Sequence, residues 1–539
     1  MTAPLLSVEH LDLSIRSQPI LSDVSLSVAA GEVLGIVGES GSGKSMTANA
    51  IMQLLPVGTA WSGAIGLSGE ALEKKTEEQM CAVRGRSIGM IFQEPMTALN
   101  PVQTIGAQVA ETIRIHTKAS AAEALKIARE TLNRVGLPEE QFPLDRYPHD
   151  LSGGQRQRVV IAMAIALRPK LLIADEPTTA LDVTTQAQIL KLLRRLVEED
   201  GMGLILITHD LAVVADMADR IVIMKDGSIV EEGETVRLFR GMRHPYTQAL
   251  FAASSHRPER AGRTAAPAAV LDVTDVVRDY ALPRRSLFRK ASRFRAVDHV
   301  SLGIRRGENV GLVGESGCGK STLTRAILAL DQLQDGRIAI EGKPFHSSDS
   351  RPDLTLRRKV QVVFQDPYSS FNPRHKVERL IAEPFYLDPQ APTGMERRRK
   401  IEALLDAVGL RPSDAGKYIH EFSGGQRQRI AIARALIIEP ALIILDEAVS
   451  ALDVSIRAQI LDLLADLSDR LHVSYLFISH DLSVVRAITD RVLVMRAGRI
   501  VEEGPTEQVF SNPKHDYTKS LIAATPDLER ALKARERAA

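Results

Sequence analysis

Hydrophobic and polar positions alternate along the chain in blocks that predict strands and helices in turn. Alternating and β-branched positions up to Val28 predict strands, and the apolar start of 34–45 predicts a buried strand that runs into a glycine-rich turn. A polar stretch at about 101–147 predicts helices. The segments that follow predict a helix that begins in 151–158, a strand at 171–175 and a helix at 186–196. A strand at 204–208 and a hairpin at 221–233 come next. Strands that alternate with helices favour a parallel α/β sheet.

The second half of the chain repeats this order. The apolar run and its glycine-rich turn return at 310–321. A repeat this long indicates two whole domains, since the units of a solenoid have about 20–50 residues. The stretch 254–269 is rich in Ala, Pro, Arg and Ser, which is typical of a linker. We therefore expect domains at 1–253 and 270–539, joined by a linker at 254–269.

Each half carries a glycine-rich phosphate loop that fits G-x-x-x-x-G-K-[ST]. Glycines let backbone N–H groups point at phosphate oxygens, and the next helix adds the positive end of its dipole. Lys44 and Lys320 can reach the β- and γ-phosphates, and Ser45 and Ser321 can hold Mg²⁺. The loop residues expected to bind nucleotide are Gly38, Glu39, Ser40, Gly41, Ser42, Gly43, Lys44 and Ser45, with Gly314, Glu315, Ser316, Gly317, Cys318, Gly319, Lys320 and Ser321.

Two acidic residues end a second apolar run in each half. The first, Asp175 or Asp446, can bind Mg²⁺ at the carboxyl end of its strand. The second, Glu176 or Glu447, can act as general base on an attacking water. A solvated strand end is the alternative interpretation. The phosphate loop in the same half favours the catalytic interpretation.

A glutamine and a histidine end further apolar runs. Gln93 and Gln365 can touch both Mg²⁺ and the attacking water. His209 and His480 can contact the γ-phosphate, although such a histidine alone would indicate only an ordinary hydrogen-bonded side chain. The order of these residues along each half is what favours the nucleotide interpretation.

A Ser-Gly-Gly-Gln segment precedes a helix in each half and predicts a second anion cradle. Each half then has two phosphate-binding surfaces, one more than a single nucleotide needs. If the halves face each other head to tail, the cradle of one can close over the nucleotide of the other. The cradle residues are Ser152, Gly153, Gly154 and Gln155, and Ser423, Gly424, Gly425 and Gln426.

Composition excludes several classes of protein. The net charge of +1 and the aromatic content of 4% do not favour nucleic-acid binding. Two cysteines cannot build a disulfide framework, which suits a reducing cytoplasm. The start of the chain lacks a signal peptide, and no apolar run approaches the roughly 20 residues of a membrane helix. The basic segment 283–295 predicts a solvated loop, or alternatively a surface for anionic headgroups or nucleotide.

Taken together, these motifs resemble those of the ABC transporter ATPases, over nearly all of both halves. The resemblance implies two tandem P-loop, RecA-like nucleotide-binding domains, each with a β-subdomain and a helical subdomain at about 101–155 or 373–426. It implies Mg-ATP hydrolysis at two sites, each completed by the Ser-Gly-Gly-Gln segment of the other half. Asp182 and Asp453 match the D-loop of the family, which lies at that interface.

Two departures from the family pattern concern the sites. The family stacks adenine on an aromatic side chain, for which Tyr280 is the candidate in the second half, whereas Ile15 takes that place in the first. Ala448 replaces the usual proline after Glu447. We expect weaker adenine stacking at the first site and hydrolysis at both.

Four short segments resemble segments of the di- and oligopeptide importers. These are 91–101, 363–373, 243–250 and 514–521, although Asp516 replaces a proline. The chain looks like the fused ATPase of the microcin C/oligopeptide type, with glutathione importers as close relatives. The resemblance implies two permease subunits and a solute-binding protein as partners, at the cytoplasmic side of the inner membrane. Cys81 and Cys318 lie outside the region where some relatives hold an iron–sulfur cluster, so we expect none.

A soluble tandem ATPase acting on ribosomes or DNA is the alternative class. Such proteins share the motor motifs, but the ribosomal type has a long charged helical linker and the DNA-repair types carry long insertions or zinc-binding cysteines. The short Ala/Pro-rich linker and the two cysteines favour the importer.

Overall fold

The chain divides into two compact units in the computed structural model. Unit 1 contains Met1–Leu181, Thr185–Ser255 and Pro526–Ala539, and unit 2 contains Asp182–Thr184 and His256–Thr525. Parts of the expected linker and of the basic segment, 261–267 and 282–292, lie outside the described residues. The domain boundaries expected from the sequence stay predictions. The structure describes residues 4–93, 98–179, 181–260, 268–281, 293–345, 353–366, 369–450 and 452–538.

A six-stranded sheet forms the centre of unit 1. Its order is β10-β9-β3-β8-β7-β6, parallel from β9 to β6, with β10 antiparallel at one edge. Every residue of β3, β7 and β8 is buried, which explains why these strands are continuous apolar runs. The strands are β3 (Val33–Val37), β6 (Ile88–Ile91), β7 (Leu171–Asp175), β8 (Gly203–Ile207), β9 (Arg220–Lys225) and β10 (Ser228–Glu234).

A second, antiparallel sheet packs against the first and corresponds to the expected β-subdomain. Its order is β2-β1-β4-β5. Leu11 and Leu13 on β1 share one hydrophobic core with Ile36 on β3 and Ile173 on β7. The strands are β1 (Leu6–Ile15), β2 (Gln18–Val28), β4 (Thr59–Leu67) and β5 (Glu70–Ala71).

The helical part of unit 1 lies where the sequence predicts it. Helices α4 and α5 fall within 101–155, and each begins at a Thr or Ser whose hydroxyl accepts a backbone N–H, an arrangement that stabilises helix starts. The helices are α1 (Lys44–Ile51), η1 (Leu72–Lys74), α2 (Glu77–Val83), α4 (Ile105–His116), α5 (Ala121–Arg134), η2 (Pro148–Asp150), α6 (Gly153–Ile165), α7 (Val183–Asp200), α8 (Leu211–Met217), α9 (Thr235–Arg240) and α10 (Pro245–Ser254).

Unit 2 repeats both sheets. Its antiparallel sheet has the order β12-β11-β14-β15 and its six-stranded sheet β16-β17-β18-β13-β19-β20. The strands are β11 (Ala269–Ala281), β12 (Arg293–Arg305), β13 (Asn309–Val313), β14 (Asp335–Ile340), β15 (Lys343–Pro344), β16 (Val360–Val363), β17 (Leu442–Asp446), β18 (Ser474–Ile478), β19 (Arg491–Arg496) and β20 (Arg499–Pro505).

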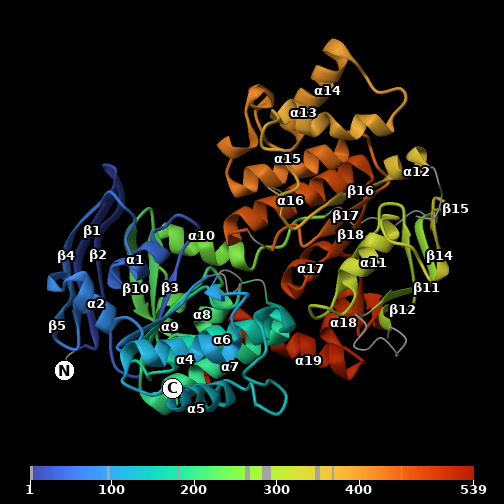
Figure 1. Ribbon diagram of the computed structural model, residues 1–539. Helices are drawn as coiled ribbons and strands as arrows, with labels where there is room; N and C mark the ends of the chain where they lie inside the picture. Colours follow the sequence, from blue (N-terminus) through green and yellow to red (C-terminus); the bar gives the residue numbers. More distant parts are fainter. Residues whose placement is uncertain are drawn as a thin grey trace. The chain divides into compact units, whose positions relative to one another are not determined.

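The helical part of unit 2 again falls where the sequence predicts it. Helices α13, α14 and α15 gather away from strands β11, β12 and β14 (Figure 1). The α/β fold with β- and helical subdomains is therefore confirmed in each unit. The helices are α11 (Lys320–Ile327), α12 (Leu354–Lys359), α13 (Val377–Ala382), η3 (Glu383–Leu387), α14 (Gly394–Ala407), η4 (Pro412–Gly416), η5 (Ile419–Glu421), α15 (Gly424–Leu436), α16 (Val454–Leu471), α17 (Leu482–Ile488), α18 (Thr506–Ser511) and α19 (Asp516–Ala524).

The last helix of the chain, α20 (Leu528–Ala538), packs in unit 1 and not in unit 2. Leu532 is fully buried there, against α8 and α9. Nη2 of Arg535 donates to the carbonyl oxygen of Asp216 at 3.0 Å, and Arg240 lies 2.9 Å from Glu536. The C-terminal segment thus completes the surface of the first half.

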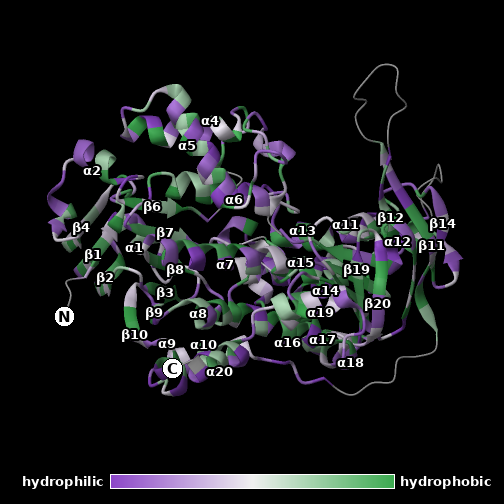
Figure 2. Cartoon of the chain, turned by 90° about the horizontal axis from the view of Figure 1, so that it is seen from below, coloured by the Kyte–Doolittle hydropathy of each residue, from purple (hydrophilic) through white to green (hydrophobic). Residues whose placement is uncertain are grey.

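Hydropathy follows this architecture. The strands of the six-stranded sheets are largely hydrophobic, whereas α4 and α5 mix hydrophilic and hydrophobic positions (Figure 2). Among the described residues, no helix combines the length and the hydropathy needed to span a bilayer.

Candidate nucleotide-binding sites

The two predicted phosphate loops lie between a buried central strand and the helix that follows it. In unit 1 the loop joins β3 to α1, which begins at Lys44 as the sequence predicts. Nζ of Lys44 donates to the carbonyl oxygens of Gly38 and Glu39, each at 2.8 Å. Nζ of Lys320 makes the same two contacts in its own loop, at 2.6 and 2.9 Å. Both lysines are buried, so each side chain lies folded across its loop.

Glycine is required at the first position of each loop. A Cβ on Gly38 would lie 2.3 Å from the backbone oxygen of Met224, and one on Gly314 would lie 2.2 Å from that of Met495. Both distances are far below a van der Waals contact. The loop can therefore approach the end of the neighbouring strand, β9 or β19, only without a side chain.

The predicted acidic pairs lie at the carboxyl ends of β7 and β17. Asp175 and Asp446 are the last residues of these strands. Glu176 and Glu447 follow with φ of 46° and 52°, in the left-handed region that few residues other than glycine adopt. Each is held by its backbone N–H, which donates at 2.9 Å to a carbonyl oxygen of the next strand. Such strain at the same position in both halves is typical of functional sites.

The predicted histidines meet these glutamates. Nδ1 of His209 lies 3.2 Å from Oε1 of Glu176, and His480 lies 3.2 Å from Glu447. In unit 1, Nε2 of Gln93 donates to the same carboxylate at 3.0 Å. The phosphate loop, the acidic pair, the glutamine and the histidine of the first half are thus gathered at one edge of the parallel sheet.

The Ser-Gly-Gly-Gln segments start helices, as the sequence predicts. The backbone N–H of Ser152 donates to Oε1 of Gln155 at 2.9 Å, and the N–H of Ser423 donates to Gln426 at 3.0 Å. A Cβ on Gly424 would meet open space. On the second glycine of each segment, a Cβ would lie 2.2 Å from Cγ2 of Thr185 at Gly154 and 2.4 Å from Cγ2 of Ile456 at Gly425, so this glycine is needed for the packing of the helix in both halves.

Comparison with known families agrees with this geometry. Residues 21–179 and 297–450 match the family described as ABC transporter, which covers more than half of the chain. The chain belongs to the ABC transporter ATP-binding family. It is therefore an ATPase with two tandem ABC domains, as the sequence motifs predict. Residues 230–276 and 501–539 match the C-terminal region of oligopeptide/dipeptide transporters.

Relatives of this ABC protein match nearly its full length. The glutathione import ATP-binding protein GsiA of Salmonella choleraesuis is 47% identical over 97% of this chain and 89% of its own. The peptidoglycan transport ATP-binding protein YejF of Agrobacterium fabrum is 46% identical over 98% of this chain and 97% of its own. Among solved structures, the ATP-binding cassette MJ0796 bound to ADP and Pi is 32% identical, with a TM-score of 0.39, and covers 43% of this chain and 98% of its own.

The electrostatics of the two ABC sites separate the two acids of each pair. Burial opposes ionisation of Glu176, yet its contacts with His209 and Thr179 bring its pKa down to about 2. Burial raises the pKa of Asp446 to about 6, and the neighbouring Glu447 adds to this rise. The pKa of Asp175 is also raised by burial. The glutamate is thus held as a carboxylate, whereas at the aspartate the nearby loop lysine, Lys44 or Lys320, does not fully offset the effect of burial.

The aspartate of the first site fits a divalent cation. Oδ1 of Asp175 is buried without a hydrogen-bond partner, and Ser45 lies within hydrogen-bonding reach of the same carboxylate. Carboxylate and hydroxyl oxygens are ligands that Mg²⁺ prefers. Within the described part of the chain, no group of three or more His, Cys, Asp or Glu side chains is placed to hold a metal ion.

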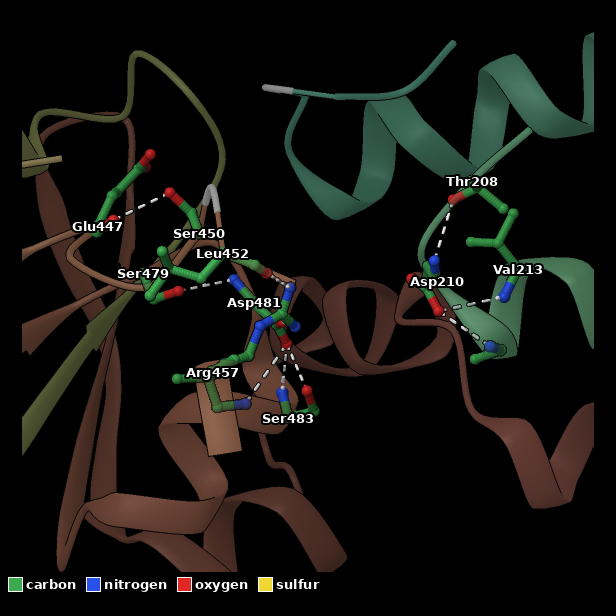
Figure 3. A network of polar contacts seen from close by, with 12 residues as sticks. Thr208, Asp210, Val213, Glu447, Ser450, Leu452, Arg457, Ser479, Asp481 and Ser483 are labelled. Carbon is green, nitrogen blue, oxygen red and sulfur yellow. Dashed lines mark hydrogen bonds and ion pairs between the residues drawn. The ribbon is translucent and has the colours of Figure 1, made fainter. Parts of the chain in front are cut away.

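One pair of residues near the ABC sites was not predicted from the sequence. Asp210 and Asp481 directly follow the site histidines and accept the first N–H groups of α8 and α17 (Figure 3). Their own N–H groups donate to Thr208 at 3.1 Å and to Ser479 at 2.9 Å. Each aspartate thereby fixes the backbone next to its histidine. The signal was available, because Asp at a strand-to-helix junction is a common N-cap.

The two ABC sites differ in detail. Thr179 donates to the carboxylate of Glu176 at 2.9 Å, whereas its counterpart Ser450 donates to the backbone oxygen of Glu447 at 2.9 Å (Figure 3). Nη1 of Arg457 donates to Asp481 at 2.9 Å, and the corresponding position in the first half is Gln186. In the second half an ion pair with Arg457 therefore supports the aspartate that follows the histidine.

Tyr280 lies on β11, with its hydroxyl donating to Asp331 at 2.9 Å. The guanidinium of Arg278 lies 4.6 Å from the ring centre. Ile15 ends β1 in the first half and offers no aromatic ring. The role of Tyr280 in stacking adenine stays a prediction.

Proposed function

We propose that this ABC protein energises the uptake of peptides or peptide conjugates through separate permease subunits. The observation that carries the proposal is that two nucleotide-site motif sets occur in one chain, each followed by the C-terminal region of oligopeptide/dipeptide transporters. The relatives GsiA and YejF support a substrate with peptide chemistry, because their names describe glutathione import and peptidoglycan transport.

Each proposed site combines one half with the Ser-Gly-Gly-Gln segment of the other, so that the halves pair within one chain. Support comes from the exposed Ser152 and Ser423, whose helix starts offer backbone N–H groups to an anion. The nucleotide would then hold the halves together, because binding that requires both surfaces stabilises their association.

Within a site, each residue has a distinct task. Lys44 and Lys320 exchange their loop carbonyls for the β- and γ-phosphates of ATP. An Oε atom of Glu176 or Glu447 accepts a proton from the attacking water. His209 and His480 contact the γ-phosphate and hold the glutamate in place. Ring stacking on Tyr280 strengthens adenine binding at the second site relative to the first.

Magnesium is the proposed metal. It would be held by Ser45, Gln93 and Asp175 in the first site, where the unpartnered oxygen of Asp175 supports the assignment. The corresponding ligands of the second site are Ser321, Gln365 and Asp446. When bound, Mg²⁺ supplies positive charge that offsets the charge of the phosphates.

The proposed partners are two transmembrane permeases and a solute-binding protein on the outer side. The chain itself would lie at the cytoplasmic face of the inner membrane and contact the membrane through the permeases. The relatives GsiA and YejF, named as glutathione import and peptidoglycan transport ATP-binding proteins, support this arrangement.

The test is uptake by cells that lack the gene. Radiolabelled glutathione, a tripeptide and a peptidoglycan-derived peptide are supplied one at a time, with and without a plasmid copy, and with Lys44→Ala plus Lys320→Ala as control. We expect the wild-type copy alone to restore uptake of at least one peptide by about tenfold or more. Two results together would instead support the soluble tandem ATPase. The deletion strain would take up all three labelled compounds normally, and ribosomes, not permeases, would co-purify with the chain.

A further inference from the structure

A tyrosine from the C-terminal region reaches the phosphate loop in each half. The hydroxyl of Tyr246, in the first turn of α10, accepts the backbone N–H of Glu39 at 3.0 Å. The hydroxyl of Tyr517, in the first turn of α19, accepts the N–H of Glu315 at the same distance. Glu39 and Glu315 are the second residues of the two loops, so the contact is repeated at equivalent atoms.

The peptide group between Gly38 and Glu39 is therefore held from both edges. Its carbonyl oxygen accepts from Nζ of Lys44 at 2.8 Å, and its N–H donates to Tyr246. In the proposed site, Lys44 leaves this carbonyl when it turns to the phosphates. Tyr246 is then the side chain that keeps the orientation of the peptide group.

The tyrosines are themselves firmly placed. Nζ of Lys225 lies 5.2 Å from the ring centre of Tyr246, and the guanidinium of Arg496 lies 4.9 Å from that of Tyr517. Lys225 and Arg496 end the strands β9 and β19, next to the methionines whose backbone oxygens face the loop glycines. Burial raises the pKa of Tyr517 to about 12, so its hydroxyl stays protonated at neutral pH.

A carboxylate anchors the segment that carries each tyrosine. Glu231 on β10 accepts the N–H groups of Arg243 and His244 at 2.8 and 3.2 Å. Glu502 on β20 accepts the equivalent two N–H groups at 2.7 and 3.0 Å. The anchor is the same in both halves, although Pro245 in one corresponds to Asp516 in the other.

We propose that Tyr246 and Tyr517 are positioning residues, through which the C-terminal region of each half holds the phosphate loop in its nucleotide-binding conformation. Both lie in the segments that match the oligopeptide/dipeptide transporter C-terminal region. This inference rests on the proposed nucleotide sites and adds a role for a region outside the ATPase motifs. The tyrosine hydroxyls contact the backbone of the loop, so their proposed effect on nucleotide acts through the loop.

The test is to replace both tyrosines by phenylalanine, which removes the hydroxyl and keeps the ring. A hydrogen bond of this kind contributes about 0.5–1.5 kcal/mol, so we expect the Kd for a fluorescent ATP analogue and the KM for ATP to rise by about 2- to 10-fold. We expect kcat to change less than twofold, because an ordered loop is needed equally by bound ATP and by the transition state. The matched control is Tyr147→Phe with Tyr418→Phe, a repeated pair that is half exposed.

Three results separate the possibilities. A raised KM in the Tyr246→Phe, Tyr517→Phe variant, with the control pair unchanged, supports the proposal. An unchanged KM and Kd together with a lower midpoint of thermal unfolding overturns it, because the hydroxyls would then only stabilise the fold. If Lys44→Ala with Lys320→Ala binds the analogue as tightly as wild type, the proposed nucleotide sites fail, whatever the tyrosine variants show.

Discussion

Nδ1 of His209 lies 3.2 Å from Oε1 of Glu176, at the point where two parallel strands end. The same contact, at the same distance, joins His480 to Glu447 in the second half. Burial opposes ionisation of Glu176, but the contact with His209, together with Thr179 and the charge of Lys44, lowers its pKa to about 2, so the side chain is a carboxylate at neutral pH. In the proposed site the histidine contacts the γ-phosphate while it holds the glutamate, so we expect this contact to link the position of the proposed base to the presence of nucleotide.

Replacing both histidines by alanine tests the proposed γ-phosphate contact. Each change removes a proposed γ-phosphate contact, for which a loss of about 10²- to 10³-fold in kcat is typical. We expect phosphate release at saturating ATP to fall by about that factor, with little change in the affinity for ATP. His149→Ala with His420→Ala is the matched control, since these two exposed histidines also form a repeated pair. A rate within twofold of wild type in the His209, His480 variant would contradict the assignment.

Metal dependence tests the aspartates. Asp175→Asn with Asp446→Asn removes one negative charge from each proposed Mg²⁺ site, so we expect at least a tenfold higher Mg²⁺ concentration for half-maximal hydrolysis. Binding of ATP in the presence of EDTA should be unchanged, which provides a control within the same protein. Equal Mg²⁺ requirements in variant and wild type would show that the metal is held elsewhere.

Acid sensitivity tests the anchor of the tyrosine segment. Burial alone would raise the pKa of Glu231, but the hydrogen bonds from the backbone N–H groups of Arg243 and His244 contribute to lowering it overall from its ordinary value of 4.5. A carboxyl group with a lowered pKa in the folded state stabilises the protein fully above its unfolded pKa, and that contribution is lost as the pH falls through the folded value. The same shift and cause apply to Glu502.

We therefore expect Glu231→Gln with Glu502→Gln to lower the midpoint of thermal unfolding at pH 7. The difference in midpoint between this variant and wild type should become smaller as the pH falls below about 4.5. Glu232→Gln, on the exposed side of the same strand, is the control and should show no such difference. A difference in midpoint that stays constant from pH 7 to pH 3.5 would mean that the ionised carboxylate is not what holds the tyrosine segment.

Packing of α20 in unit 1 leads to a prediction about local stability. Deletion of 526–539 exposes the surface that Leu532 covers and removes the contacts of Arg535 with Asp216 and Asp219. We expect hydrogen exchange to speed up in α8 and α9, because burial and hydrogen bonds there are lost. The counterparts in unit 2, α17 and α18, serve as the internal control. Faster exchange confined to unit 2 would contradict the placement of this helix.

Sequence reasoning predicted what local pattern determines. The buried strands, the glycine-rich turns and the strand-end acids each leave a signature within a few residues, and the repeat confirmed their order. Two contacts could not be predicted, namely the hydrogen bond of Tyr246 with Glu39 and the packing of α20 against α8. In each contact the partners lie far apart along the chain, and no local pattern encodes their meeting. Asp210 and Asp481 could have been found, because an N-cap next to a site histidine is a local feature.

Steady-state phosphate release by the Glu176→Gln, Glu447→Gln double variant tests the central claim most directly, namely that the two glutamates are the catalytic bases. The replacement keeps the size of each side chain and removes its ability to accept a proton. The account predicts a fall of about 10²- to 10⁴-fold with binding of ATP retained, and an intermediate rate in each single variant. Hydrolysis by the double variant at the wild-type rate would contradict it.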